Sequence, residues 1–335
     1  MDALLVEATR GDRVESRHAG SAVVIDAHGA VLFQAGDIDA PFYTRSTVKA
    51  LLALPLVETG AADRLGLTDA ELALACASHV GEPVHVETAA SMLHKAGQQP
   101  GCLECGVHWP TSRAGQRALV EAGAEPSALH NNCSGKHAGF VCLAVDAGVA
   151  VQGYVRPEHQ TMRQVTAALA DMTGARLDDG NRAIDGCAIP TYAIPLRALA
   201  LGFARFGAGI GMHPDRHRAA SRLRAAVAAN PVLVAGPGRF DTRVMQAFGG
   251  AVFSKMGAEG THVLSLPEQG LGIAVKCADG ATRAAELVAA ALLARHVPAT
   301  PEQQALLQTL VRPRLQNWNG TEVGTLRPAG ALASS

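Results

Sequence analysis

The sequence predicts an α+β fold in which one antiparallel sheet is built from both chain ends and a helical lobe is inserted between them. Short β-branched runs lie near both ends of the chain, whereas the middle is rich in Ala and Leu with apolar residues three and four apart. The 335 residues are 48% apolar and only 18% charged, which fits a globular protein and excludes a disordered or coiled-coil one. Because no linker separates two cores, we expect a single domain over residues 1–335.

The expected sheet begins with a β-hairpin. Ser21–Ile25 and Ala30–Phe33 are β-branched or aromatic runs joined by the turn-rich segment Asp26–Gly29. Three further short strands, separated by glycine and proline, are expected at 251–255, 261–266 and 271–277. The small-residue tail from about 326 to 335 is expected to be frayed.

The expected helices follow the apolar periodicity between these strands, with one more after the last strand. They are 46–59, 68–76, 85–96, 111–122, 135–147, 157–173, 190–206, 217–229 and 281–296.

The composition also excludes some classes of binding partner and indicates the cellular compartment. With 29 basic against 30 acidic residues and 4% aromatics, the chain lacks the charge and the stacking rings that nucleic acids require. No apolar run is long enough for a membrane span, and charges interrupt the N-terminal apolar runs before a signal peptide can form. Seven cysteines, an odd number, favour reduced thiols over a disulfide framework. We therefore expect a cytoplasmic protein with no nucleic-acid or membrane partner.

A first candidate site is the pair Ser46 and Lys49, at the start of an expected helix. Their spacing of three places them about one turn apart on one face, so the lysine amine could take the hydroxyl proton of the serine. The alternative is that Ser46 is an N-cap and Lys49 is solvated.

A second candidate is the segment His130–Gly139, which carries amide, thiol, amine and imidazole groups. It does not fit a phosphate-binding loop, because His130 stands where the first glycine should be and His137 follows the lysine. Spacing favours a metal site of Cys133, His137 and the distant Cys187. The alternative is that both cysteines are small buried apolar residues.

A further motif, the Cys-x-x-Cys of Cys102 and Cys105, has no second cysteine pair at zinc-finger spacing. It is interpreted as a loop feature, and the alternative is a second, weak metal site.

At these residues the chain resembles the rhizobial-type (class 3) L-asparaginases, over about residues 5 to 325. Five strings in order support the resemblance: Arg45–Lys49, Cys76–Glu82, His130–Gly139, Asp185–Cys187 and Lys255–Gly260. That family is similar in fold to serine β-lactamases and glutaminases, so the resemblance implies a serine β-lactamase-like fold. It also implies a homodimer.

The resemblance implies roles for individual residues. It makes Ser46 with Lys49 one catalytic pair and Ser78 with a C-terminal lysine a second; we place that lysine at Lys255, in a Lys-x-Gly string, with Lys276 as the alternative. It implies a zinc ion held by Cys133, Lys136 and Cys187, where spacing alone favours His137 over Lys136. Substrate-facing roles then go to Arg45, His137 and Asp185.

The implied function is hydrolysis of L-asparagine to L-aspartate and ammonia through a Ser-Lys nucleophile in a pocket shaped by zinc. Two other functions stay open: a different Ser-Lys amidohydrolase of glutaminase or β-lactamase type, and a zinc-dependent binding protein without turnover.

Overall fold

The computed structural model describes residues 1–333, and these form two compact units. The sheet unit comprises Met1–Thr47, Ile194–Ile210 and the chain from Ser254 onward. The helical unit comprises Val48–Ala193 and Gly211–Phe253. The predicted α+β class, with a sheet from both chain ends and helices inserted between them, is confirmed. The prediction of one domain stays a prediction.

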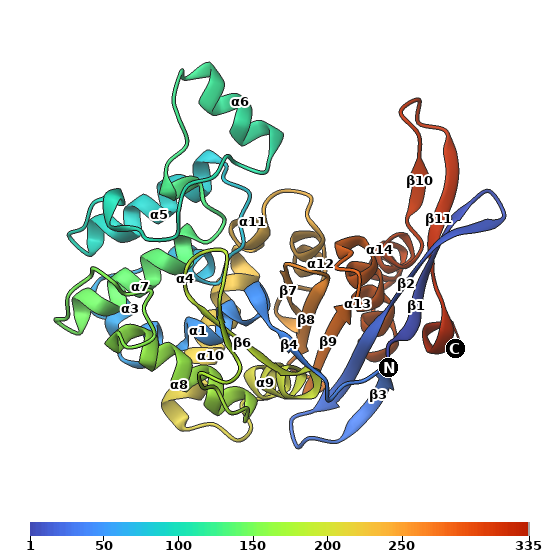
Figure 1. Cartoon of the computed structure of the whole chain (residues 1–335), viewed down its shortest axis with the longest axis horizontal. Helices are drawn as coiled ribbons and strands as arrows, with labels where there is room; N and C mark the ends of the chain where they lie inside the picture. The colour runs from blue at the N-terminus through green and yellow to red at the C-terminus, as the bar shows by residue number, and fades with distance from the viewer. Residues whose placement is uncertain (334–335) are drawn as a thin grey trace. The chain divides into compact units, whose positions relative to one another are not determined.

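The sheet places the first and last strands of the chain next to each other, as the blue and red ends show in Figure 1. Its order is β10-β11-β1-β2-β9-β8-β7, with β3 paired to β2. Both the predicted hairpin, β2 with β3, and the three predicted C-terminal strands, β7 to β9, are present. The strand bounds are β1 Ala3–Arg10, β2 Arg13–Asp26, β3 Val31–Ala35, β7 Phe253–Gly257, β8 Thr261–Leu266, β9 Leu271–Cys277, β10 Arg314–Gln316 and β11 Glu322–Pro328.

The tail that was expected to be frayed begins inside β11. Leu326 and Pro328 are opposite Ala8 and Val6 of β1, and the side chain of Leu326 is 1% exposed. Residues 330–332 form the short helix η5. The prediction is wrong for 326–332 because strand pairing and a buried leucine hold this segment. Residues 334–335 lie outside the described part of the chain.

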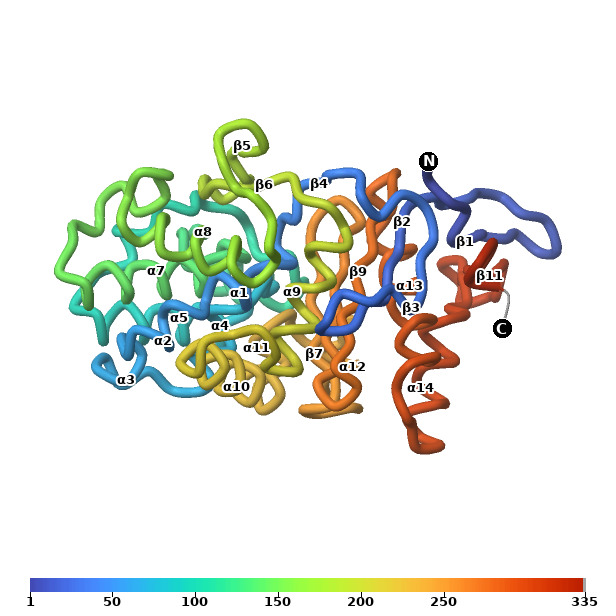
Figure 2. The backbone as a smooth tube through the Cα atoms, turned by 90° about the horizontal axis from the view of Figure 1, so that it is seen from below, coloured from blue at the N-terminus to red at the C-terminus, as the bar shows by residue number. Residues whose placement is uncertain are grey.

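Two helices, α9 (Leu196–Ala208) and α13 (Thr282–His296), pack against β8 and β9, and α14 (Pro301–Val311) packs on α13. Every residue of β8 is buried, which shows that both of its faces are covered. Gly272 allows the closest approach, since a Cβ there would lie 2.0 Å from the carbonyl oxygen of Ala200 in α9. In Figure 2 the blue β2 runs beside the orange β9.

The helical unit is built around α7 (Ser134–Asp146), which is buried from Ser134 to Ala144 and packs against α4 and α5. Gly135 permits this packing, because a Cβ there would lie 2.3 Å from the carbonyl oxygen of Leu74 in α4. The start of α7 is thereby held against the end of α4. The other helices of the unit are α1 Lys49–Leu52, α2 Leu54–Glu58, α3 Ala61–Arg64, α4 Asp69–Ala75, α5 Pro83–Lys95, α6 Arg113–Glu121, α8 Gln160–Thr173, α10 Pro214–Ala229, α11 Pro231–Ala235 and α12 Phe240–Phe248.

Two predicted helices are corrected. The helix expected over 46–59 is divided into η1 (Arg45–Val48), α1 and α2, because Pro55 has no N–H to continue the ladder. The helix expected over 190–206 starts only at Leu196; β6 (Pro190–Pro195) precedes it and pairs with β5 (Arg182–Ile184). Prolines at both ends of this run and β-branched or aromatic residues between them favour the extended form. A further short strand, β4, spans Pro41–Tyr43.

Over residues 1–333 no helix combines the length and the apolar character needed to cross a membrane.

Candidate functional site

A buried lysine and a serine are in contact at the centre of the helical unit. The Lys49 side chain is 1% exposed, and its Nζ donates to Ser78 Oγ at 2.9 Å. The same Nζ donates to the carbonyl oxygens of Ala77 at 2.5 Å and of Asn132 at 3.4 Å. Lys49 therefore joins the loop after α4 to the loop before α7. A serine hydroxyl held by a buried amine is a group that can serve in acyl transfer.

Two stacked histidines support the Ser78 loop. The rings of His79 and His85 are 4.9 Å apart and nearly parallel, and both residues are buried. The Gly81 N–H donates to His79 Nδ1 and the Glu82 N–H to His85 Nδ1, so both rings use Nδ1 as an acceptor. His79 Nε2 is then the protonated nitrogen, 2.9 Å from Ser134 Oγ at the start of α7. Burial, and the nearby His85 and Lys49, hold the pKa of His79 well below its usual range.

The residues of the predicted metal site also converge within the helical unit. Lys136 Nζ donates to Cys187 Sγ at 2.9 Å, and Cys133 and Cys187 share a side-chain hydrogen bond. The Cys187 thiol also lies 3.3 Å from Asp185 Oδ2. All three proposed ligands are buried. Among residues 1–333 no group of three or more His, Cys, Asp or Glu side chains could hold a metal ion. The third proposed ligand of this site is a lysine, which such a group does not include.

The electrostatics of this cluster favour one thiolate. The hydrogen bond from Cys187 and the ammonium groups of Lys136 and Lys49 outweigh burial and hold the pKa of Cys133 well below its usual range. The same hydrogen bond, together with burial, raises the pKa of Cys187. Burial works against the charge on Lys136, but the two cysteines raise its pKa overall. These shifts favour a thiolate at Cys133, a thiol at Cys187 and an ammonium at Lys136.

Within the described part of the chain, the His137 side chain makes its one hydrogen bond with Tyr154. Its Nδ1 is 2.7 Å from the hydroxyl of Tyr154, and its ring meets the Tyr154 ring edge-on at 5.5 Å. Its Nε2 is buried and has no hydrogen-bond partner among residues 1–333. Burial, and after it Lys136 and Lys49, keep the pKa of His137 well below its usual range, so the ring is neutral.

Three predicted site residues belong to the sheet unit. Arg45 and Ser46 lie in η1, and Arg45 has a φ of 50°, an uncommon value for a residue with a Cβ. Lys255 lies in β7, is 0% exposed, and donates from Nζ to the carbonyl oxygen of Met256 at 2.7 Å. Its alternative, Lys276, donates to the carbonyl oxygen of Cys277 at 2.9 Å and is half-buried.

The Cys-x-x-Cys segment borders the thiol cluster. Cys105 is buried close to Cys133, and burial raises the pKa of its thiol to about 12. Its carbonyl oxygen accepts from the Asn131 side chain at 2.9 Å. Cys102 is half-buried, and burial raises the pKa of its thiol too. Both thiols therefore remain protonated near neutral pH.

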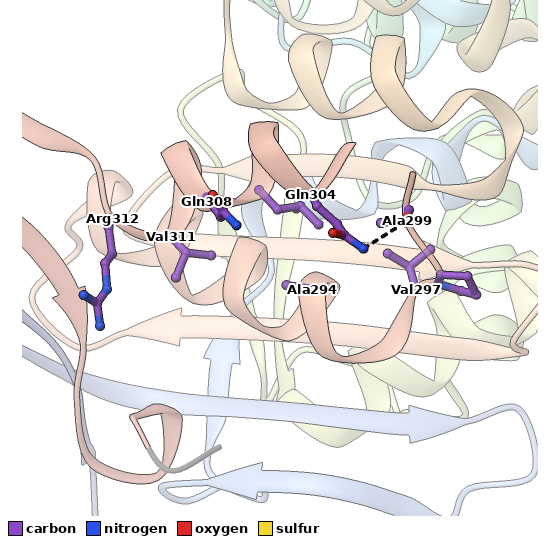
Figure 3. Close-up of a pocket in the computed structure, with 9 residues that line it drawn as sticks. Ala294, Val297, Ala299, Gln304, Gln308, Val311 and Arg312 are labelled. Carbon is purple, nitrogen blue, oxygen red and sulfur yellow. Dashed lines mark hydrogen bonds between the residues drawn. The ribbon is translucent and has the colours of Figure 1, made fainter. Parts of the chain in front are cut away.

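A cavity of about 560 Å³ lies in the sheet unit, between the end of α13 and α14. Figure 3 shows its lining, which includes Gln304, Gln308 and Arg312 from α14. The Gln304 side chain donates to the carbonyl oxygen of Ala299 at 3.1 Å. None of the predicted site residues lines this cavity.

Sequence reasoning missed Tyr154 and Glu104. The Glu104 N–H donates to the Tyr154 hydroxyl at 2.8 Å, and the Glu104 carboxylate accepts from the Gly153 N–H at 2.7 Å. Neither residue belongs to a recognisable spacing pattern. The one available signal was that Tyr154 is one of only three tyrosines in the chain.

The sequence matches the family model of L-asparaginase II over residues 6–328. The match covers nearly the whole chain and includes every predicted site residue. The family places the protein among the amidohydrolases. The chain belongs to the L-asparaginase II family. A comparison with curated proteins gave no significant match.

Solved structures are similar to this chain only at low identity. A β-lactamase of Mycobacterium bovis is 15% identical, with 83% of this chain and 95% of that chain covered and a TM-score of 0.41. A simvastatin synthase of Aspergillus terreus is 13% identical, with 77% and 85% covered and a TM-score of 0.34.

Proposed function

We propose that this protein is an L-asparaginase that hydrolyses L-asparagine to L-aspartate and ammonia. The observation that carries the proposal is the L-asparaginase II match over residues 6–328, and the contact between the buried Lys49 amine and Ser78 agrees with it. The homodimer and the cytoplasmic location stay predictions.

In the proposed reaction, Ser46 Oγ attacks the side-chain amide carbon of asparagine and loses its proton to a neutral Lys49. A proton passed to the amide nitrogen lets ammonia leave, and water then hydrolyses the acyl-enzyme to aspartate. The hydrogen bond of 2.9 Å between Lys49 Nζ and Ser78 Oγ supports a proton route from the first pair to Ser78. Assignment of Lys255 as the second lysine rests on the resemblance, and its full burial suits an amine that must lose its proton.

Three residues are proposed to bind the substrate. Arg45 suits the α-carboxylate, because a guanidinium forms two parallel bonds with a carboxylate. Asp185 suits the α-ammonium, and it also orients the Cys187 thiol, 3.3 Å away. His137 offers the buried Nε2 that lacks a partner among residues 1–333.

The donor set of Cys133, Lys136 and Cys187 fits a zinc ion. Two thiols in hydrogen-bond contact, with one pKa already lowered to favour thiolate, are ligands that a borderline-soft ion prefers. The contact of Lys136 with Cys187 supports Lys136 as the third ligand, and its amine would bind the ion only after losing a proton. When bound, zinc would fix the shape of the pocket and lower the charge on its thiolates.

The test measures ammonia release by the purified protein from L-asparagine and from L-glutamine, and the absorbance change of a chromogenic β-lactam. The proposal expects fast release from asparagine and little reaction with the β-lactam. A preference for glutamine or the β-lactam would establish one of the other Ser-Lys activities. Binding of asparagine without ammonia release would instead favour the zinc-dependent binding protein.

A further inference from the structure

His137 presents a buried nitrogen that the protein itself does not use. The residue lies in the first turn of α7 and is 0% exposed. Its Nε2 has no hydrogen-bond partner among residues 1–333. A polar atom left unpaired in a protein interior costs about 1–3 kcal/mol, so such an atom points to a group that arrives with a ligand.

The state of this nitrogen follows from the hydrogen bonds of Tyr154. The Tyr154 hydroxyl accepts from the Glu104 N–H at 2.8 Å and lies 2.7 Å from His137 Nδ1. Tyr154 is 0% exposed, so its own proton needs an acceptor within the protein. His137 Nδ1 provides that acceptor, and the ring proton is therefore on Nε2.

Three further contacts stabilise this arrangement. The Glu104 carboxylate accepts from the Gly153 N–H at 2.7 Å. Glu104, whose own N–H donates to the Tyr154 hydroxyl, is therefore also bonded to the residue before Tyr154. The His137 ring also packs against Phe140 at 5.8 Å and against Tyr154 at 5.5 Å, at steep interplanar angles. Neither ring can turn without losing these contacts.

We propose that Tyr154 is a positioning residue, which holds His137 in the Nε2–H tautomer so that this N–H donates to an oxygen of the substrate. The inference rests on the proposed function and extends it. It assigns His137 to an acceptor oxygen, of a carboxylate or an amide carbonyl, and not to an amino group.

The kinetic test uses two replacements of His137, each of which keeps a hydrogen-bonding group at the place of only one ring nitrogen. In His137→Gln the amide nitrogen reaches the place of Nε2, whereas in His137→Asn it reaches only the place of Nδ1. His137→Asn should raise KM for asparagine about tenfold with a smaller change in kcat, because a bond made in both ground and transition states contributes mainly to binding. His137→Gln should lose less.

Tyr154→Phe should raise KM by about threefold to tenfold in the wild-type background and have no further effect beside His137→Gln. Tyr192→Phe is the matched control, since Tyr192 is also buried but lies in β6. Equal effects of Tyr154→Phe in both backgrounds would overturn the proposal.

Nitrogen NMR measures the tautomer of His137 directly and does not depend on enzymatic activity. In protein with labelled histidine, two-bond proton–nitrogen spectra distinguish Nε2–H from Nδ1–H, and His137→Gln identifies the signal among 13 histidines. We expect Nε2–H in wild type, a shift on adding L-aspartate, and a mixture of tautomers in Tyr154→Phe. An Nδ1–H ring in wild type, with ammonia still released from asparagine, would refute the positioning role alone. A fixed Nε2–H ring without ammonia release would instead refute the proposed function.

Discussion

Strand β9 of the sheet unit and helix α7 of the helical unit bury different kinds of residue. β9 buries apolar and small residues, and Gly272 lets α9 approach its backbone. The first turn of α7 buries Lys136 and His137, which an apolar core would exclude. Burial of these two polar side chains lowers the stability of the fold at the start of α7. Such unfavourable burial is concentrated at functional sites.

Both units contain bonded buried polar residues, and those of the helical unit include two buried amines that join separate loops and a pair of thiols. Lys49 joins two loops, and the Cys133 cluster includes the bond from Lys136 to Cys187. A buried charge is tolerated only with such partners, because its desolvation costs several kcal/mol. The comparison therefore predicts that changes at the Lys49 and Cys133 clusters affect activity more than stability, and that changes in the apolar packing of β9 do the reverse.

The largest expected effect is on turnover in Lys49→Met. Loss of the amine should reduce kcat about 1,000-fold, while the melting temperature stays the same or rises because a buried amine is removed. Steady-state ammonia release and thermal unfolding measure the two quantities.

Lys95→Met is the control for this variant within the same unit. Lys95 Nζ bonds Glu71 Oε2 at 2.6 Å outside the proposed site. Burial opposes ionisation of Glu71, but the bonds from Lys95, Thr68 and Ser91 hold its pKa below its usual range. Lys95→Met should therefore lower stability by about 1–3 kcal/mol and leave kcat unchanged. Near-normal turnover in Lys49→Met would mean that the proposed base is wrong.

Next comes a purely structural effect in the sheet unit. Gly272→Ala places a Cβ 2.0 Å from the Ala200 carbonyl oxygen, so α9 and β9 must separate. We expect a loss of about 3 kcal/mol in the free energy of unfolding, measured with denaturant, and unchanged kcat at low temperature. Gly250→Ala is the control, because a Cβ there meets nothing within 4 Å. If Gly272→Ala lowered kcat as strongly as Lys49→Met, the contrast between the two units would be lost.

These contrasts also explain how much of the fold the sequence could predict. β8 and β9 were predicted within a residue because β-branched runs bounded by glycine have one favoured structure. β1 was missed because the charged Glu7 and Arg10 interrupt its apolar run, and β11 because its tail sequence resembles a loop. Each of these two strands forms by pairing with the other, and the two lie at opposite ends of the sequence. A local sequence pattern therefore does not predict either strand.

The candidate site was predictable only where the chemistry is local. Cys133 was identified because it lies in one short, reactive segment, whereas Lys136 was assigned through the family resemblance; the structure brings Cys187 to Lys136. Spacing favoured His137 as a ligand, since imidazole binds zinc more readily than an amine. The structure instead pairs His137 with Tyr154, a contact between residues 17 positions apart that spacing rules do not describe.

A smaller effect is expected from metal removal. If zinc is bound by Cys133, Lys136 and Cys187, chelation should raise KM for asparagine about tenfold with less change in kcat, because a positioned pocket contributes to ground and transition states alike. Cys187→Ala should reproduce the chelated enzyme, whereas Cys277→Ala, a buried cysteine of the sheet unit, should not. Metal analysis of purified protein provides the independent readout. Absence of zinc there, or loss of kcat with KM unchanged after stripping, would contradict the positioning role.

The smallest effect concerns pH. His79 and His85 are buried as neutral rings, and burial lowers the pKa of both. In the unfolded chain each ring binds a proton below about pH 6.5, so the folded state is disfavoured by up to about 1.4 kcal/mol per ring for each pH unit below that value. The stability of this region is therefore complete above about pH 6.5 and is lost as the pH falls. Protonation at Nδ1 would also place two donors face to face, against the N–H groups of Gly81 and Glu82.

Amide hydrogen exchange at pH 7.5 and 5.5, corrected for the intrinsic rates, measures this effect region by region. We expect amides of α4 and α5 to lose protection at the lower pH, and those of β9 to change less. His85→Asn should reduce the pH dependence in α5, since its amide does not titrate. Equal loss of protection in β9 and α5 would show that the pH response belongs to the whole chain, and the two stacked histidines would then have no special part in it.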